Sequence, residues 1–199
     1  MESIKKILIV SDLHGQKFTL ELVKKYLEKN KIDAVFCCGD LCNRYDPKAF
    51  KFAKEFVELI KNIYNLPLLV VHGNQEPEDV LKLFNQENIS VHLKEKKLFE
   101  YNVVGVGFGE ELPNDKKYFQ GKIVLTHEPP RKKIIDKMIK EKTIIDAPIL
   151  HFAGHLHKYT KIYKIGFKTQ IIFVPTLQNH RAVLLTLPEE KIDFIRCTG

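Results

Sequence analysis

Residues 4–40 read IKKILIVSDLHGQKFTLELVKKYLEKNKIDAVFCCGD and contain two short apolar runs on either side of a helical pattern. The runs are Ile4 to Val10, which is rich in β-branched residues, and Ala34 to Cys38. Between them, apolar residues recur at helical spacing from Phe18 to Leu27. A strand, a helix and a second strand in this succession predict an α/β fold with a largely parallel sheet.

The same alternation continues to Ile89. A third strand is predicted from Leu66 to Val71. Asp46 and Pro47 predict the N-cap and first position of a second helix, and Pro77 predicts the start of a third, with Val80, Leu81 and Phe84 facing inward.

The second half of the chain changes character. A helix is expected near Arg131 to Lys140, but most apolar segments here are short and separated by turn residues, which is typical of strands. The predicted strands are Lys97–Tyr101, Val103–Phe108, Lys122–Thr126, Ile149–Phe152, Tyr159–Ile165, Thr169–Val174, Ala182–Leu187 and Ile192–Ile195. We therefore predict a second sheet that is antiparallel or mixed and packs on the first.

Length and composition limit the classes of protein that remain. With 199 residues and 44% hydrophobic residues, the chain is long enough for one core and short for two, so we expect a single domain over residues 1–199. The apolar runs fall far short of the ~20 residues that cross a bilayer. The four cysteines form no zinc-type pairs and are expected as reduced, mostly buried thiols of a cytoplasmic protein.

The formal charge of +7 raises the question of a polyanionic partner. Basic residues cluster from Lys94 to Lys97 and from Arg131 to Lys142, but acidic residues are interspersed and no aromatic residues alternate with the lysines. A solvated basic face explains this pattern, so nucleic acid is a possible partner and not the favoured one.

Polar side chains with ligating atoms follow five of the predicted strands. In α/β sheets, ligands bind beyond the carboxyl ends of strands. Residues two apart in an extended segment point the same way, so we expect such pairs to aim into one site. A glycine precedes three of the side chains and would let the backbone turn sharply. The full set is Asp12, His14, Asp40, Asn74, His127, His155 and His157.

The blocks SDLHG, GDLCNR, HGNQE, THEPP and GHLH together resemble the calcineurin-like metallophosphoesterase family. That family carries DxH, GDxx(D/N), GNH(D/E), H and GHxH in the same order. The resemblance spans Asp12 to His157 and implies the family's two-sheet sandwich flanked by helices. It implies a first metal bound by Asp12, His14, Asp40 and His157. It implies a second metal bound by Asp40, Asn74, His127 and His155, with Asp40 bridging the two ions.

The charge of such a site suits a phosphate. Two divalent ions bring about four positive charges, of which Asp12 and Asp40 remove about two and a bridging hydroxide about one. The expected reaction is hydrolysis of a phosphoester, more a diester than a monoester, by the hydroxide that bridges the metals. Nitrogen and oxygen ligands suit Mn, our preferred ion, and also Fe, Zn, Ni or Co. The substrate is expected to be a small phosphoester or a nucleotide, and the oligomeric state stays open.

Gln75 departs from the family pattern, since it stands where the family has a histidine, and Glu76 follows where that histidine's acidic partner would stand. An amide can donate hydrogen bonds but cannot serve as a general acid at neutral pH. This favours diesters or substrates with good leaving groups, as in family branches that lack the histidine. An inert substitution in a degraded site is the alternative.

Arg44 resembles the arginine that contacts phosphate in the phosphoprotein phosphatases, and we expect it to act beside Asp40, Asn74 and His127. A guanidinium there would bind phosphoryl oxygens bidentately. A surface arginine is an equally good interpretation. Of the remaining histidines, His72, His92 and His151 are expected to be structural. A surface role is favoured for His180, although it could also approach the site from a late loop.

Two other functions fit parts of the pattern. A nuclease resembling the double-strand-break repair enzymes of the same superfamily fits the basic charge, but those enzymes keep the missing histidine and carry a capping domain. A protein-binding scaffold resembling the retromer subunit fits Gln75. The complete set of seven ligating side chains opposes the scaffold, because a scaffold has no physical need to concentrate such groups.

Overall fold

The two ends of the chain build the first sheet. The structure, a computed structural model, describes residues 3–110, 113, 116–130, 150–158, 160–165 and 169–198. Among these residues, the first sheet contains β1 (Lys5–Val10), β2 (Ala34–Cys37), β3 (Leu68–Val70), β10 (Arg181–Leu187) and β11 (Lys191–Arg196). The order is β11-β10-β1-β2-β3, with β1, β2 and β3 parallel and the other two strands antiparallel.

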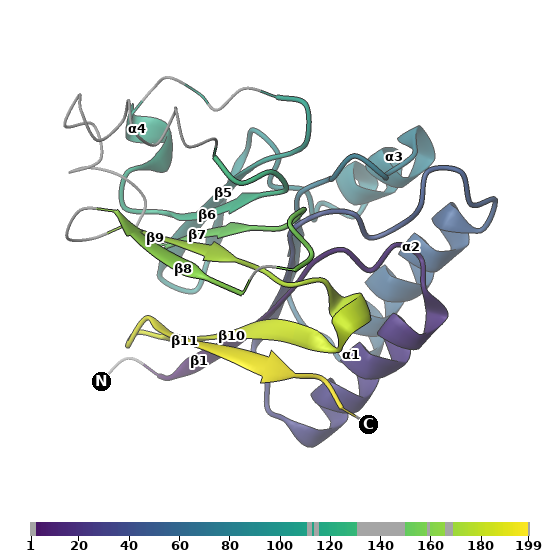
Figure 1. Cartoon of the computed structure of the whole chain (residues 1–199), viewed down its shortest axis with the longest axis horizontal. Helices are drawn as coiled ribbons and strands as arrows, with labels where there is room; N and C mark the ends of the chain where they lie inside the picture. Colours follow the sequence, from purple (N-terminus) through teal and green to yellow (C-terminus); the bar gives the residue numbers. More distant parts are fainter. Residues whose placement is uncertain are drawn as a thin grey trace.

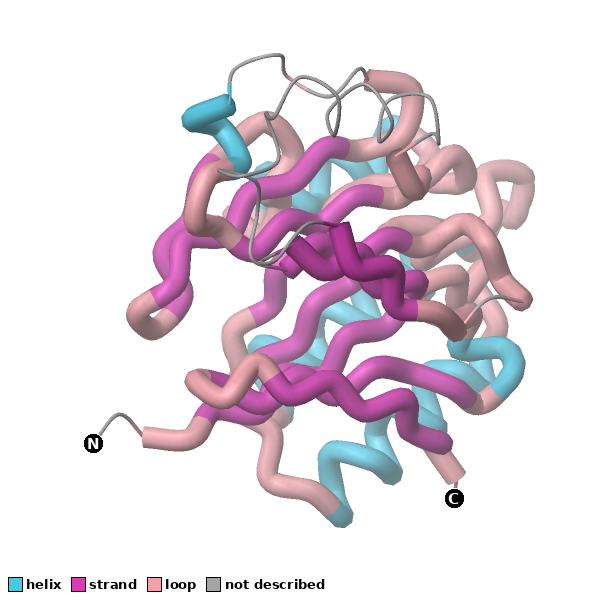
Figure 2. Tube along the Cα trace, turned by 60° about the vertical axis from the view of Figure 1, so that its left-hand side comes forward, coloured by secondary structure: helices cyan, strands magenta, loops and turns pink. Residues whose placement is uncertain are grey.

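The middle of the chain builds the second sheet. Its described strands are β4 (Glu95–Leu98), β5 (Tyr101–Val106), β6 (Ile123–Thr126), β7 (Leu150–Ala153), β8 (Ile162–Ile165) and β9 (Thr169–Phe173). In the order β4-β5-β6-β7-β9-β8, the four inner strands are parallel and the two edge strands antiparallel. The strands gather in two layers (Figure 2), so the predicted pair of sheets and the mixed second sheet are confirmed.

An apolar core joins the two sheets. Along β1, Ile7 and Ile9 point into this core, whereas Leu8 and Val10 point to the opposite face, because side chains alternate along a strand. Since both faces are buried, the strand is apolar without interruption. The second sheet contributes to the same core with Leu125, Leu150, Phe152 and Ile172, among others.

Helices cover the outer face of the first sheet. They are α1 (Lys17–Lys29), α2 (Ala49–Glu58), which continues into η1 (Leu59–Ile63), and α3 (Glu78–Gln86). Figure 1 shows α1, α2 and α3 along one side of the molecule. On the outer face of the second sheet lies the short α4 (Lys116–Phe119), and Phe119 packs there with Val104 and Val124. One turn, η3 (Leu177–Asn179), precedes β10.

Several predicted boundaries differ from the structure. Helix α2 begins at Ala49 and not at Pro47, because Asp46 Oδ1 accepts a hydrogen bond from Lys48 N at 2.8 Å in a turn that precedes the helix. Helix α3 buries Leu83 in place of Leu81.

The first hairpin of the second sheet was also predicted with a shifted turn. The turn lies at Phe99 and Glu100, before β5 begins at Tyr101, and Phe99 has a φ of 54°. Strand β4 lies at the edge of the sheet, and three of its four residues are charged. The sequence therefore lacks the apolar pattern that would have marked where this strand begins and ends. The helix predicted for residues 131–140 lies outside the described residues.

The prediction of unpaired, buried cysteines is confirmed. All four cysteines are free and buried. Among the described helices, none has the length and apolar character that a membrane span needs.

His151 is a buried histidine of β7 whose protonation state follows from its partner. The Thr126 hydroxyl donates to Glu128 O at 2.7 Å, so it accepts from His151 Nε2, which lies 2.8 Å away. Burial lowers the pKa of His151 to about 4. The folded protein therefore holds a neutral imidazole here, as expected for a structural histidine.

We expect His151 to make the protein acid-sensitive. Since its pKa is lower in the folded than in the unfolded state, the unfolded chain takes up a proton first, and stability falls as pH drops from about 6.5 to about 4. Relative to His151→Leu, the wild type should lose about 1.4 kcal/mol per pH unit in that range. Urea unfolding of both proteins at several pH values measures this. Parallel pH curves would contradict the assignment.

Candidate metal centre

The loops after β1 and β2 run side by side and carry the first polar groups of the site. Asp12 N donates to Gly39 O at 3.0 Å, and His14 N donates to Asp40 O at 2.9 Å. The expected extended conformation is wrong here, because several site residues have positive φ, which non-glycine residues adopt at a cost of order 1–3 kcal/mol each. They are Asp12 (56°), His14 (51°), Asp40 (51°) and His155 (66°).

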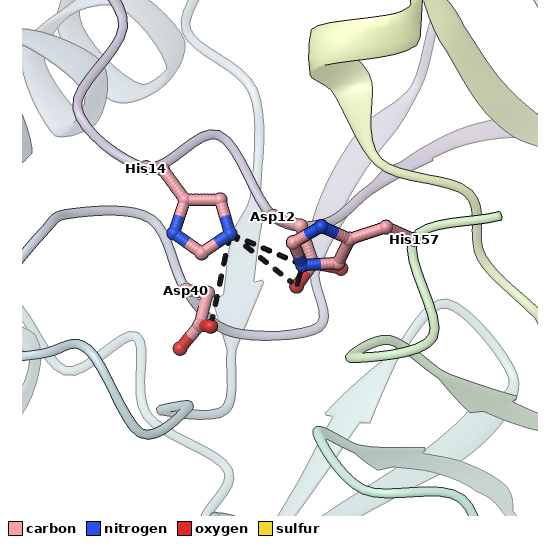
Figure 3. A group of neighbouring side chains, drawn as sticks. All are labelled: Asp12, His14, Asp40 and His157. Carbon is pink, nitrogen blue, oxygen red and sulfur yellow. Dashed lines mark hydrogen bonds and ion pairs between the residues drawn. The ribbon is translucent and has the colours of Figure 1, made fainter.

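A first group of side chains consists of Asp12, His14, Asp40 and His157, whose ligating atoms all lie within 4.8 Å of one another (Figure 3). His157 Nε2 lies 3.1 Å from Asp12 Oδ1 and 3.2 Å from His14 Nε2. His14 Nε2 lies 3.9 Å from Asp12 Oδ1 and 3.9 Å from Asp40 Oδ2. Four atoms with lone pairs therefore face one small volume.

Asp12 shows that this volume suits a cation. Its side chain is fully buried, and Oδ2 accepts from His155 N at 3.1 Å. Among the described residues, Oδ1 has no hydrogen-bond partner, although His157 Nε2 is close. A buried carboxylate oxygen without a partner is costly. Because this oxygen faces imidazole nitrogens, a metal ion bound between them would satisfy all of these atoms at once.

A second group joins the first at Asp40. His127 Nε2 lies 3.5 Å from Asp40 Oδ2, 3.1 Å from Asn74 Oδ1 and 3.2 Å from His155 Nδ1. His127 Nδ1 donates to Cys38 O at 2.9 Å, so the lone pair of Nε2 is directed into the group. Acceptor atoms again face one another, an arrangement that either a proton or a bound cation stabilises.

The charges in this region shift the pKa values of its members. Burial alone would raise the pKa of Asp40 and lower that of His127, but their hydrogen bond and opposite charges outweigh burial. The pKa of Asp40 is therefore below its usual value and that of His127 above it. For His14, burial dominates and lowers the pKa, which favours the neutral imidazole that metals bind.

All seven side chains singled out in the sequence thus lie in two adjoining groups that share Asp40. His155 and His157 lie in different groups, as the resemblance implies: His155 Nδ1 faces His127, and His157 Nε2 faces Asp12. Arg44 is exposed in the loop after β2 and has no hydrogen bond or ion pair with the described residues.

Two glycines are needed where the loops meet, for different reasons. Gly39 has a φ of +91°, and a Cβ there would lie 2.6 Å from His127 Nδ1. At Gly73 no unusual φ is required, but a Cβ would overlap the Asp40 carboxylate. The expectation that both glycines serve sharp turns therefore holds for Gly39, whereas Gly73 is there for close approach.

Glu76 is a functional residue whose role the sequence did not reveal. Its side chain is buried, and its carboxylate accepts four backbone hydrogen bonds from the loops after β2 and β3. One oxygen accepts from Leu41 N at 2.5 Å and Cys42 N at 3.3 Å. The other oxygen accepts from Gly73 N at 2.5 Å and Asp40 N at 3.3 Å. Burial, followed by the nearby Asp40 charge, raises its pKa to about 7. Glu76 therefore ties the loop after β2 to the loop after β3.

Thr176 supports the site from the far end of the chain. Its hydroxyl donates to Asp12 O at 2.8 Å and accepts from Gln178 N at 3.2 Å. Thr176 lies just before η3, and no motif marks it. Only the pairing of the C-terminal strands with β1 brings it next to Asp12.

Three further histidines, His72, His92 and His180, lie outside the two ligand groups. His72 and His92 meet edge to face with ring centroids 4.6 Å apart, and burial lowers the pKa of both. His180 is exposed and stacks on Phe18 at 5.8 Å. These placements agree with the structural and surface roles expected of them.

Replacing Glu76 tests its role as a tie between loops. Glu76→Ala removes the acceptor of four buried N–H groups and should lower the free energy of unfolding by about 3 kcal/mol. Glu78→Ala is the matched control, since Glu78 is exposed and pairs only with Lys82 among the described residues, and it should leave stability nearly unchanged. Urea unfolding measures both. Equal stability of the two variants would contradict the role.

The chain is similar to known proteins over most of its length. The protein MJ1162 of Methanocaldococcus jannaschii, which is uncharacterized, is 24% identical over 193 residues, covering 81% of this chain and 84% of that protein. The crystal structure of TT1561 of Thermus thermophilus has a TM-score of 0.72 at 20% identity, covering 98% of this chain and 100% of that chain. A novel archaeal phosphodiesterase has a TM-score of 0.64 at 14% identity, covering 96% and 99%.

The structural likenesses show the two-sheet fold, and the family model for calcineurin-like phosphoesterases matches residues 5–159. That segment contains every strand-end residue of the two ligand groups. The chain belongs to the calcineurin-like phosphoesterase family.

Proposed function

We propose that this protein hydrolyses phosphodiesters with the help of two divalent transition metal ions, manganese being the preferred one. The observation that supports this most is the sharing of Asp40 between two groups of ligating atoms, with Asp40 Oδ2 3.9 Å from His14 Nε2 and 3.5 Å from His127 Nε2. One carboxylate between two such groups is what a pair of metal ions needs. The proposal takes residues 1–199 as one catalytic domain.

Each residue has a role in this proposal. One ion would be bound by Asp12, His14 and His157. The other ion would be bound by Asn74, His127 and His155. Asp40 would bind both ions. Two bound cations would supply positive charge for the phosphoryl oxygens and a nucleophilic hydroxide at neutral pH. Cys38 O and Thr176 would keep His127 and Asp12 oriented through their hydrogen bonds.

Gln75 supports the preference for diesters over monoesters. Its backbone N donates to Asp40 Oδ1 at 2.9 Å, so the residue stands beside the shared carboxylate. A glutamine side chain can donate a hydrogen bond to a phosphoryl oxygen, but it has no proton to give to a leaving alkoxide. The similarity in fold to an archaeal phosphodiesterase is in keeping with this substrate class.

Asp40→Asn tests the shared site. The wild type should hold close to two metal ions per chain after loading with Mn²⁺. This isosteric change removes the negative charge between the two groups, so the variant should hold fewer. Hydrolysis of bis(4-nitrophenyl) phosphate should fall by more than about 100-fold. Even the loss of a residue that only hydrogen-bonds to a metal ligand lowers metal affinity or activity by about 10–100-fold. Metal is measured by mass spectrometry after desalting.

The matched control is Asp193→Asn on β11, where Asp193 pairs with Lys191 at the edge of the first sheet. It should keep both the metal and the activity. A wild-type protein that takes up no metal at saturating Mn²⁺ would support the scaffold function instead. Cleavage of DNA in preference to small diesters would support the nuclease.

Gln75→His tests the account of the leaving group. A histidine at this position could donate a proton to the departing oxygen, so hydrolysis of phosphomonoesters with alkyl leaving groups should rise by about 10²-fold or more. Diesters with a 4-nitrophenolate leaving group need no such proton and should change little. The ratio of the two kcat/KM values is the measurement, and an unchanged ratio would show that Gln75 is not what limits monoester hydrolysis.

A further inference from the structure

Phe108 is an exposed aromatic residue at the rim of the two ligand groups. It follows β5 by two residues and keeps 37% of its surface exposed. Its ring centroid lies 6.2 Å from that of His127, at an interplanar angle of 68°, and 6.2 Å from that of His155, at 37°. Among the large apolar side chains that the structure shows as exposed, Phe108 is the one in ring contact with these two histidines.

The backbone holds Phe108 in this position. Phe108 N donates to His72 O at 3.0 Å, two residues before Asn74, and Gly107 N donates to His92 Nδ1 at 3.0 Å. A Cβ at Gly107 would overlap the His72 ring. The loop after β5 is thereby held against the segment that carries Asn74, and the backbone of Phe108 is placed next to the second ligand group.

The Phe108 side chain borders both buried polar groups and solvent. Its ring contacts the buried His127, yet Phe108 leaves more than a third of its surface exposed beside a strongly polar cluster. A phosphate bound between the two ligand groups would lie close to the Phe108 ring, because His127 and His155 belong to the second group and both contact that ring. An exposed π face at this position is suited to a flat group attached to the phosphate, since base–aromatic stacking needs no particular hydrogen-bond pattern.

We propose that Phe108 is a stacking platform for a planar aromatic group, a nucleobase or an aryl ring, carried by the phosphoester substrate. This inference rests on the proposed function and names the substrate class of the same site. Phe108 determines specificity by binding and takes no part in bond cleavage. It selects phosphoesters with a flat substituent over those with an aliphatic one.

Binding of three phosphates to the Mn²⁺-loaded protein tests the platform. They are adenosine 5′-monophosphate, phenyl phosphate and ribose 5-phosphate, which share the phosphate and differ in the flat group. In Phe108→Leu, which keeps an apolar side chain without a π face, binding of the aromatic ligands should weaken about tenfold, and that of ribose 5-phosphate should not change. Phe108→Tyr keeps the ring and should keep wild-type binding. Isothermal titration calorimetry measures each dissociation constant.

Comparing adenosine 5′-monophosphate with phenyl phosphate shows whether the planar group of the substrate is a nucleobase or an aryl ring. A selective loss of adenosine 5′-monophosphate binding in Phe108→Leu supports a nucleotide, and a selective loss of phenyl phosphate binding supports an aryl ester. Phe194→Leu is the matched control, because Phe194 has a similar exposed fraction, 38%, but lies on the edge strand β11. It should leave all three dissociation constants unchanged.

Failure of the platform is distinguishable from failure of the proposed function. If the wild type binds all three phosphates and Phe108→Leu weakens them equally or not at all, the platform is overturned while phosphoester hydrolysis stands. If the Mn²⁺-loaded wild type binds none of the three, the platform is overturned, whereas the proposed function is overturned only if the Mn²⁺-loaded wild type also fails to hydrolyse bis(4-nitrophenyl) phosphate.

Discussion

The structure depends on holding the buried Asp40 carboxylate between two sets of ligating atoms. Oxygen and imidazole lone pairs that face one another repel unless a proton or a cation lies between them. The chain holds them together with positive φ angles at Asp12, His14 and Asp40, and with Glu76, whose two oxygens bind four backbone N–H groups from both loops. Stability of the surrounding sheets offsets the cost of this arrangement.

The sandwich explains how such distant residues meet. The loops that follow the parallel strands β1, β2 and β3 of the first sheet carry Asp12, Asp40 and Asn74. In the second sheet, the loops after β6 and β7 carry the histidines of the site, which are His127, His155 and His157. Because the core between the sheets fixes one against the other, the carboxyl ends of both sets of strands lie at one edge. Each sheet alone would supply only part of either ligand group.

Residues next to the two ligand groups orient the ligating side chains and border the space where a substrate would bind. The backbone carbonyl of Cys38 accepts a hydrogen bond from His127, and the Thr176 hydroxyl donates one to Asp12 O. One residue of each ligand group is therefore held in place by a hydrogen bond from outside the group. Gln75, beside Asp40, has a side chain that cannot act as a general acid at neutral pH, while Phe108 places an exposed aromatic ring against His127 and His155.

The sequence by itself determined the α/β class, the strands that end in ligating residues and the identity of the seven side chains, because apolar runs and motif spacing are local properties. It misplaced the turn at Phe99, since an edge strand of charged residues has no apolar pattern. Only the tertiary structure decided that Glu76 binds backbone, that Thr176 supports Asp12 and that Phe108 borders His127. These contacts join residues from separate loops and, for Thr176, from opposite ends of the chain, and they depend on sheet packing that no local pattern encodes.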